Sequence, residues 1–168
     1  MSTNNDAINN QIIKEVIQRE GGATATNDPS DAGGRTQYGI SERSHPKAWL
    51  DSQVTLAEAI DVYHQKYLKG PGFDRITDPR LRSQLVDYGV NSGPGVAIQK
   101  LQSVLKVEID GILGPKTLAV ANAADPVLLG NKLALERVKM IGRIVNKNSG
   151  QAKFLNGWLD RALSFLHL

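Results

Sequence analysis

Apolar residues near the start of the chain recur at the spacing of a helix that begins near Asp6. The apolar positions are Ile8, Ile12, Ile13, Val16 and Ile17. Glu20 is the next position on the same row, and Gly21 and Gly22 follow it. We therefore expect the helix to end at a carboxylate on its buried side, with Gly21 supplying the left-handed backbone that closes a helix.

Helical patterns continue through the rest of the chain, and several begin at a capping residue. Thr55 and Glu58 have the spacing of a capping box. Asp78 and Asp125 each precede a proline suited to the first helical position. Strands are not expected beyond a small hairpin near residues 23–40. The chain is thus predicted to be mainly α-helical, with a small loop or hairpin excursion after the first helix.

Glu20 is a candidate general acid. Burial disfavours the charged form of a carboxyl group, and the negative end of the helix macrodipole does the same, so both raise its pKa. A raised pKa is what a proton donor needs near neutral pH. The alternative is an ordinary exposed glutamate in the last turn of a helix, followed by a glycine cap.

The Gly-rich stretch after this helix carries Asp28, Asp31 and Thr36. A loop of this kind can fold back over the helix end and hold a second carboxylate and a hydroxyl opposite Glu20. Two carboxylates flanking a glycosidic bond are the usual equipment of glycoside hydrolysis. The alternative for both aspartates is turn formation, since Asp readily bonds its own backbone in turns.

These residues together resemble the signature of the family 108 glycoside hydrolases. The matching blocks are Glu20-Gly21-Gly22, Asn27-Asp28-Pro29 and Asp31-x-Gly33-Gly34-x-Thr36-x-Tyr38-Gly39-Ile40-Ser41. Members of this family are N-acetylmuramidases of lysozyme-like fold, found as phage endolysins and in bacterial toxin-release systems. The resemblance implies a lysozyme-like helical fold.

The resemblance also implies roles for particular residues. Glu20 would protonate the glycosidic oxygen. Asp31, or else Asp28, would orient water or stabilise the oxocarbenium-like sugar, and Thr36 would help to position that water. Tyr38, within the same block, is a candidate substrate contact.

Two segments of the C-terminal half extend the resemblance. Residues 87–93 resemble the family's Asp-x-x-x-Asn-x-Gly pattern, in which Asn91 is a candidate ligand for an acetamido group or else a helix-end cap. Residues 101–117 resemble peptidoglycan-binding helical modules, where an Asp-Gly turn and a Gly-Pro helix start set the angle between two helices. We expect a catalytic lysozyme-like lobe at 1–86 and a helical peptidoglycan-binding-like lobe at 87–168, packed as one compact domain.

The two tryptophans are interpreted as packing residues. Where the family closes a helix with a Tyr-Trp pair, this chain has Leu68 after Tyr67, so a sugar-stacking tryptophan is missing there. Trp49 could stack on a sugar ring beside a cleft, but an aromatic residue there is more often part of the core, and we interpret it so. Trp158 lies among leucines and phenylalanines at helical spacing, which is typical of a core residue.

Composition narrows the functional classes. The 168 residues include no cysteine, which excludes disulfides and thiolate metal sites. A net charge of +3, without a dense Lys/Arg run or a nucleic-acid motif, argues against nucleic-acid binding. The three histidines are too scattered for a metal site, and we expect neither metal nor cofactor. No apolar run has membrane-spanning length.

The N-terminal residues lack the basic start and apolar core of a signal peptide. We therefore expect synthesis in the cytoplasm and action on the cell wall or periplasm after holin-type or dedicated release. The expected partner is the peptidoglycan glycan strand, without stable membrane insertion, and the expected oligomeric state is a monomer.

The sequence thus predicts a bacteriolytic peptidoglycan hydrolase that cleaves the β-1,4 bond between N-acetylmuramic acid and N-acetylglucosamine. Two alternatives stay open: a non-catalytic wall-binding or secretion-accessory protein, and a lytic transglycosylase that leaves a 1,6-anhydro product. The choice between endolysin and secretion muramidase is open too, as is the second catalytic aspartate. Carboxyl groups roughly 6.5–9.5 Å apart would favour inversion and about 5 Å would favour retention.

Overall fold

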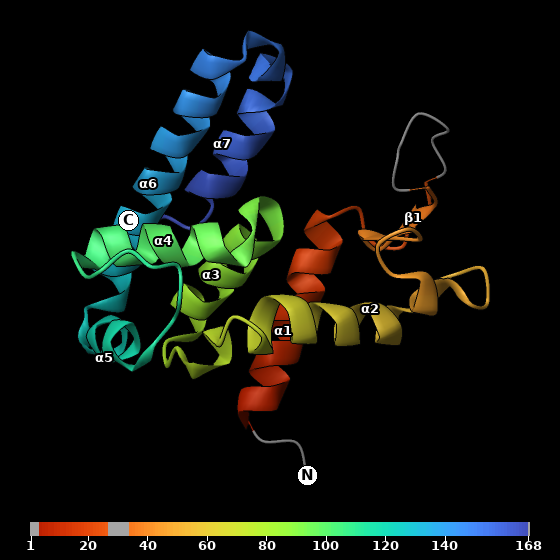
Figure 1. Ribbon diagram of the computed structural model, residues 1–168, viewed down its shortest axis with the longest axis horizontal. Helices are drawn as coiled ribbons and strands as arrows, with labels where there is room; N and C mark the ends of the chain where they lie inside the picture. The colour runs from red at the N-terminus through yellow and green to blue at the C-terminus, as the bar shows by residue number, and fades with distance from the viewer. Residues whose placement is uncertain (1–3, 27–33, 168) are drawn as a thin grey trace. The chain divides into compact units, whose positions relative to one another are not determined.

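The computed structural model describes residues 4–26 and 34–167 (Figure 1). The chain divides into two compact units, residues 1–70 and 71–168, and each is described by itself. Within the described residues, no helix is both long enough and apolar enough to span a bilayer.

The first unit joins two packed helices to a small hairpin. Its elements are α1 (Asn4–Arg19), β1 (Thr36–Gln37), β2 (Ile40–Ser41), η1 (Pro46–Trp49), α2 (Leu56–Tyr63) and the π-helical segment η2 (His64–Lys69). The apolar row predicted for the first helix is buried, since Ile13 and Val16 are fully enclosed. The expected capping box at Thr55 and Glu58 is present at the start of α2.

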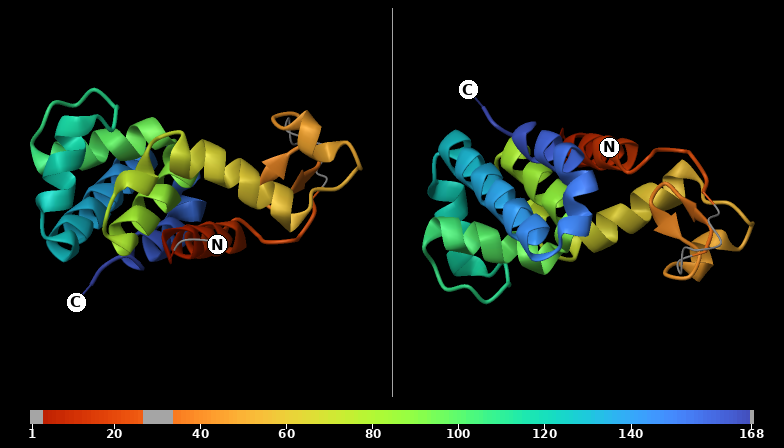
Figure 2. Two further views of the ribbon diagram at one scale, coloured as in Figure 1. Left: turned by 90° about the horizontal axis from the view of Figure 1, so that it is seen from below. Right: turned by 90° about the horizontal axis from the view of Figure 1, so that it is seen from above.

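All the regular secondary structure described in the second unit is helical. Its elements are η3 (Phe73–Arg75), α3 (Pro79–Ser92), α4 (Pro94–Leu105), α5 (Pro115–Ala123), α6 (Pro126–Lys147), η4 (Ser149–Phe154) and α7 (Leu155–Leu163). The long helix α6 and the last helix α7 lie side by side and are joined by η4, as both views in Figure 2 show. Asp78 and Asp125 cap α3 and α6 as predicted, each accepting backbone N–H bonds.

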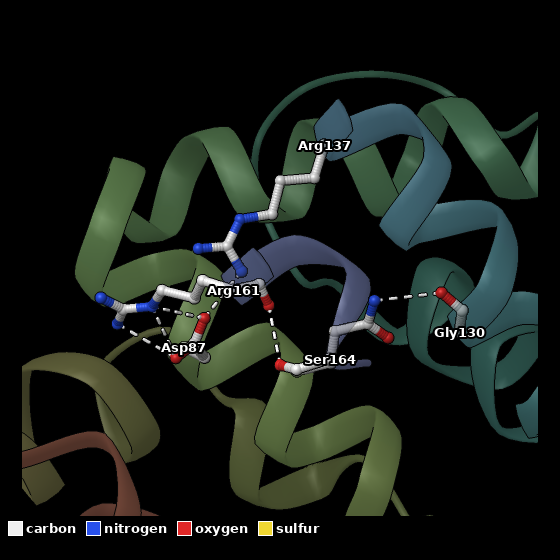
Figure 3. A network of polar contacts seen from close by, with 6 residues as sticks. Asp87, Gly130, Arg137, Arg161 and Ser164 are labelled. Carbon is white, nitrogen blue, oxygen red and sulfur yellow. Dashed lines mark hydrogen bonds and ion pairs between the residues drawn. The ribbon is translucent and has the colours of Figure 1, made fainter. Parts of the chain in front are cut away.

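A buried charge network ties α3 to α6 and α7 (Figure 3). The carboxylate of Asp87 accepts hydrogen bonds from Nη1 of Arg137, at 2.7 Å, and from Nε of Arg161, at 3.0 and 3.1 Å. Burial by itself would raise the pKa of Asp87, but the hydrogen bond from Arg161 and the charges of both arginines outweigh burial and hold this pKa below its ordinary value. Arg137 also lies over the ring of Tyr88, 5.0 Å from its centroid.

The Asp-Gly turn before α5 is organised by a buried amide. Gln102 of α4 is fully enclosed, and its Nε2 donates to Oδ1 of Asp110, at 2.6 Å, and to the carbonyl oxygen of Ile112, at 3.0 Å. Its Oε1 accepts the backbone N–H of Gly111 at 2.9 Å. The Asp-Gly turn expected from the sequence is therefore stabilised by hydrogen bonds to one buried side chain, that of Gln102.

The mainly α-helical fold with a small hairpin after the first helix is confirmed. The predicted lobe boundary at residues 86–87 lies inside α3. The assignment of one lobe to catalysis and the other to peptidoglycan binding stays a prediction.

Candidate active site

Glu20 sits where α1 is closed by two glycines. Its N–H donates to the carbonyl oxygen of Val16, at 3.1 Å. The N–H of Gly21 donates to Gln18 and that of Gly22 to Ile17, which is the pair of bonds that defines a Schellman motif. Gly21 has a φ of 103°, so the predicted glycine closure is confirmed.

The environment of the Glu20 side chain is divided between protein and solvent. The residue as a whole is half-buried, whereas its Oε1 is shielded from solvent. A carboxyl group that is shielded from solvent on one side and accessible on the other is suited to general acid–base chemistry.

The hairpin turn lies directly against Glu20. Strands β1 and β2 are antiparallel, and the turn between them consists of Tyr38, with φ 52°, and Gly39, with φ 73°. Positive φ at both central residues is the mark of a type I′ turn, which matches the twist of a two-stranded ribbon. A Cβ added to Gly39 would lie 3.3 Å from Cβ of Glu20 and would overlap the hydroxyl of Tyr63. Glycine is therefore required here both by conformation and by close approach.

Tyr63 anchors this turn from α2. Its buried hydroxyl donates to the carbonyl oxygen of Tyr38, at 3.1 Å. A bulky residue in the left-handed region costs about 1–3 kcal/mol and persists only where its surroundings impose it. Tyr38 is such a residue, and the hydrogen bond from Tyr63 is one of the contacts that impose it. Strain of this kind, directly beside a half-buried carboxyl group, marks a candidate functional site.

Several contacts fix the base of the hairpin. Thr26 pairs with Thr36 through two backbone hydrogen bonds, of 2.8 and 2.9 Å. The guanidinium of Arg35, just before β1, makes a two-pronged bond to the carboxylate of Glu42, just after β2. This bond lowers the pKa of Glu42 and raises that of Arg35. The indole N–H of Trp49, which is buried as expected, donates to the carbonyl oxygen of Ile40 at 3.2 Å.

The structure brings together Glu20 and the turn that contains Tyr38, two of the residues singled out in the sequence. Thr36 lies in β1, where its hydroxyl faces the carbonyl oxygen of Gly34 at 3.5 Å. Asp28 and Asp31 lie outside the described residues. Asn91 belongs to the second unit, where it is exposed in the last turn of α3. The catalytic and substrate-binding roles of these six residues stay predictions.

Sequence reasoning missed Tyr63 and Gly39 as parts of the site. Tyr63 is buried in α2, but its spacing along the helix does not reveal which carbonyl its hydroxyl reaches. The Tyr38-Gly39 dipeptide in the middle of the excursion was the available signal for a two-residue hairpin turn. The parts of the chain that the structure describes contain no cluster of three or more His, Asp or Glu side chains able to hold a metal ion.

Comparisons with known proteins bear on the family and the fold. Residues 13–93 match the family model described as Glycosyl hydrolase 108, and residues 96–163 match the model described as Predicted Peptidoglycan domain. Among solved structures, the chain is similar to one described as the structure of Brucella abortus SagA, at 27% identity and a TM-score of 0.66, with 95% of each chain covered. A search of curated proteins found no match. The resemblance read from the sequence and the predicted lysozyme-like fold class are both confirmed.

Proposed function

We propose that this chain, whose N-terminal half belongs to the glycosyl hydrolase 108 family, is an N-acetylmuramidase. Its reaction is hydrolysis of the β-1,4 bond between N-acetylmuramic acid and N-acetylglucosamine in peptidoglycan. The match of the C-terminal half to a predicted peptidoglycan domain supports peptidoglycan as the substrate. We also propose that the enzyme acts as a monomer on the wall, after release from the cytoplasm by a holin-type or dedicated system.

The observation that carries the proposal is the position of Glu20. This carboxyl group closes a helix, has one oxygen shielded from solvent and lies against the strained turn at Tyr38 and Gly39. A protein that only binds glycan has no need to hold a carboxyl group in such a setting. The second candidate, a non-catalytic wall-binding protein, is therefore the weaker one.

The proposed chemistry uses Glu20 as the general acid. Protonated Glu20 gives its proton to the glycosidic oxygen, the bond from that oxygen to the anomeric carbon breaks, and positive charge spreads over the sugar ring. Water then attacks the anomeric carbon, and its proton passes to a carboxylate, either that of the loop aspartate or that of the now deprotonated Glu20. Asp31, or else Asp28, is proposed to orient this water or to stabilise the sugar cation, with Thr36 helping to place the water.

A lytic transglycosylase would use the same glutamate with a different nucleophile. There the C6 hydroxyl of the cleaved sugar attacks its own anomeric carbon, so that the product is a 1,6-anhydro sugar lacking one water. Mass spectrometry of the released muropeptides separates the two reactions. We expect products that carry a free reducing end.

The test compares wild type with Glu20→Gln on purified peptidoglycan. This substitution keeps the shape and hydrogen-bonding capacity of the side chain and removes the transferable proton. Loss of a general acid is worth roughly 10²- to 10⁴-fold in rate, and we expect a drop of that size in muropeptide release. Equal circular dichroism and melting temperature would show that both proteins are folded.

Glu15→Gln is the matched control, because Glu15 is an exposed glutamate of the same helix. It should hydrolyse peptidoglycan at the wild-type rate. Full activity of a folded Glu20→Gln protein would overturn the mechanism. If wild type sediments with the wall but releases nothing from it, the non-catalytic binding function is correct.

A further inference from the structure

The first unit carries an open cavity beside α2 and η2. It has a volume of about 460 Å³. Five residues line it: His45, Asp61, Val62, Gln65 and Lys66. Sites that bind small molecules commonly have volumes of roughly 300–1,000 Å³, so the cavity is large enough for such a ligand. None of the five residues takes part in the contacts around Glu20 described above.

Helical spacing places a carboxylate and an ammonium group along the same wall of this cavity. Asp61 lies in α2, and Lys66 follows five residues later in the π-helical segment η2. In a π-helical turn the backbone repeats after five residues, so positions i and i+5 share a face. Val62 and Gln65 lie between the two charged residues. The wall therefore has an acidic end and a basic end on one helix.

The π-helical turn is closed by a glycine. The N–H of Gly70 donates to the carbonyl oxygen of Gln65 at 2.8 Å, which is a bond across five residues. A Cβ added to Gly70 would lie only 2.6 Å from that same oxygen, so the turn leaves no room for a side chain there. π-Helical turns are rare and occur frequently at functional sites. This one contributes Gln65 and Lys66 to the cavity wall.

The two charged groups of the wall are available to a ligand. Within residues 4–26 and 34–167, neither Asp61 nor Lys66 takes part in an ion pair with another side chain. Both residues are exposed. The lining thus presents one negative and one positive charge, and the two balance.

His45 lines the cavity from the segment that follows β2. It is half-buried, and its Nδ1 is hydrogen-bonded to Oγ of Ser44 at 2.8 Å. Burial lowers the pKa of His45, and the positive charge of Lys66 lowers it further. The imidazole is therefore neutral near neutral pH. It adds a hydrogen-bonding group to the cavity and leaves the charge balance unchanged.

We propose that this cavity binds a short peptide through its free ammonium and carboxylate ends. Asp61 pairs with the ammonium group and Lys66 with the carboxylate. His45 and Gln65 offer hydrogen bonds to the peptide group, and Val62 contacts a small side chain. Five residues of helix advance roughly 7 Å, and two residues of extended peptide span about the same distance, roughly 7 Å. A dipeptide therefore suits the spacing of the two charged residues.

Ligands that carry a single charge fit this lining less well. A simple anion would meet the carboxylate of Asp61, and a simple cation would meet the ammonium group of Lys66. Like charges brought together in this way disfavour binding. The proposal does not depend on the proposed function, since neither Glu20 nor the glycan enters it. Two sources supply short peptides of this kind: proteins, with L-residues, and the bacterial wall, which also contains D-residues.

The test follows the backbone amide signals of residues 61–66 in ¹⁵N-correlated NMR spectra of the full-length wild type. L-alanyl-L-alanine should shift these signals in a saturable way. N-acetyl-L-alanyl-L-alanine lacks the ammonium group, and L-alanyl-L-alanine amide lacks the carboxylate. Each blocked peptide should bind about two- to fivefold more weakly, the value of one exposed ion pair.

D-alanyl-D-alanine is the second arm of the same titration. Saturable binding of either free dipeptide supports the site, and the tighter of the two identifies the source. Tighter binding of the L-dipeptide points to proteins as the source, and tighter binding of the D-dipeptide points to the wall.

Substitutions assign each charge to one end of the peptide. Lys66→Gln should weaken binding of the free dipeptide about two- to fivefold, but it should not weaken binding of the dipeptide amide, which has no carboxylate. Asp61→Asn should weaken binding of the free dipeptide and spare the N-acetyl dipeptide. Lys69→Gln is the matched control, because Lys69 is an exposed lysine of η2 that does not line the cavity. It should bind the dipeptide as wild type does.

Three results would overturn the site: no saturable shift with either free dipeptide, equal binding of free and blocked peptides, or unchanged dipeptide binding by both Lys66→Gln and Asp61→Asn. The site and the proposed function fail separately. Peptidoglycan hydrolysis that is lost in Glu20→Gln, without any dipeptide binding, leaves the function and removes the site. Selective dipeptide binding by a wild type that does not hydrolyse peptidoglycan does the reverse.

Discussion

The hydroxyl of Tyr63 donates to the carbonyl oxygen of Tyr38, at 3.1 Å, and joins α2 to the turn that covers Glu20. The two residues are 25 positions apart in the chain. Because the Tyr63 hydroxyl bonds to the backbone of the turn, it restrains the backbone conformation of Tyr38 and does not depend on the position of the Tyr38 side chain. A site of this kind depends on residues that hold the turn as well as on the reacting carboxyl group.

Replacing Tyr63 by Phe should therefore affect catalysis more than stability. Loss of one neutral hydrogen bond costs about 0.5–1.5 kcal/mol of unfolding free energy. A small displacement of the turn beside Glu20 should lower kcat roughly tenfold or more, with little change in KM. Thermal unfolding and peptidoglycan kinetics measure the two effects. Tyr67→Phe, which changes the ring next to Tyr63, is the control, and equal kcat values for both variants would contradict the positioning role.

Gly39→Ala should be damaging on two grounds. The residue has a positive φ, and a Cβ would overlap the Tyr63 hydroxyl and approach Cβ of Glu20. We expect a loss of about 1–3 kcal/mol in unfolding free energy together with loss of peptidoglycan hydrolysis. Gly142→Ala provides the contrast, because Gly142 is a helical glycine with open space around it, and it should gain about 0.5–1 kcal/mol. Urea denaturation of both variants is the measurement, and equal stability would refute the close packing.

Asp87→Asn should strongly destabilise the second unit. Asp87 is fully buried, and its partner Arg137 is 2% exposed. Removing the negative charge leaves buried guanidinium groups uncompensated, for which about 3–5 kcal/mol is typical. Glu136→Gln is the comparison, because its surface pair with Lys139 should contribute no more than about 1 kcal/mol. Similar urea midpoints for the two variants would show that the network contributes little.

The same carboxylate predicts a dependence of stability on pH. The pKa of Asp87 is lower in the folded protein than its ordinary value, so the unfolded chain binds more protons as acid is added. Its stabilising contribution is full above the unfolded pKa of about 3.9 and is lost as the pH falls through the folded pKa. Wild type should lose unfolding free energy steeply below about pH 4. Urea titrations across this range should give a shallower slope for Asp87→Asn, and parallel slopes would exclude Asp87 as the source.

Local patterns in the sequence predicted the end of the first helix and the position of the hairpin. The apolar row leading to Glu20, followed by two glycines, is a signal that depends only on neighbours in the chain, and the Schellman motif confirms it. The hairpin at residues 36–41 lies at the C-terminal end of the range predicted near residues 23–40. Capping at Thr55, Asp78 and Asp125 is local as well, and it is confirmed.

Contacts between distant segments were not predictable in the same way. Gln102 is fully buried because the Asp-Gly turn, several residues later in the chain, satisfies the hydrogen bonds of its amide. Trp158 has the spacing of a core residue, but it is only half-buried and lines a cavity with Asn91 and Met140. The spacing of a core position and of a cavity wall is the same. Only the arrangement of the facing helices distinguishes them.

The Asp87 network also bears on how the protein is made. Arg161 follows Asp87 by 74 residues. The ribosome therefore completes α3 long before it adds Arg161, the second arginine that pairs with Asp87. Until α7 has been synthesised, the buried carboxylate can pair with Arg137 alone. A nascent chain that stops before α7 therefore lacks the hydrogen bonds that Arg161 donates to this buried carboxylate. The second unit can therefore complete its buried network only after nearly the whole chain has been synthesised.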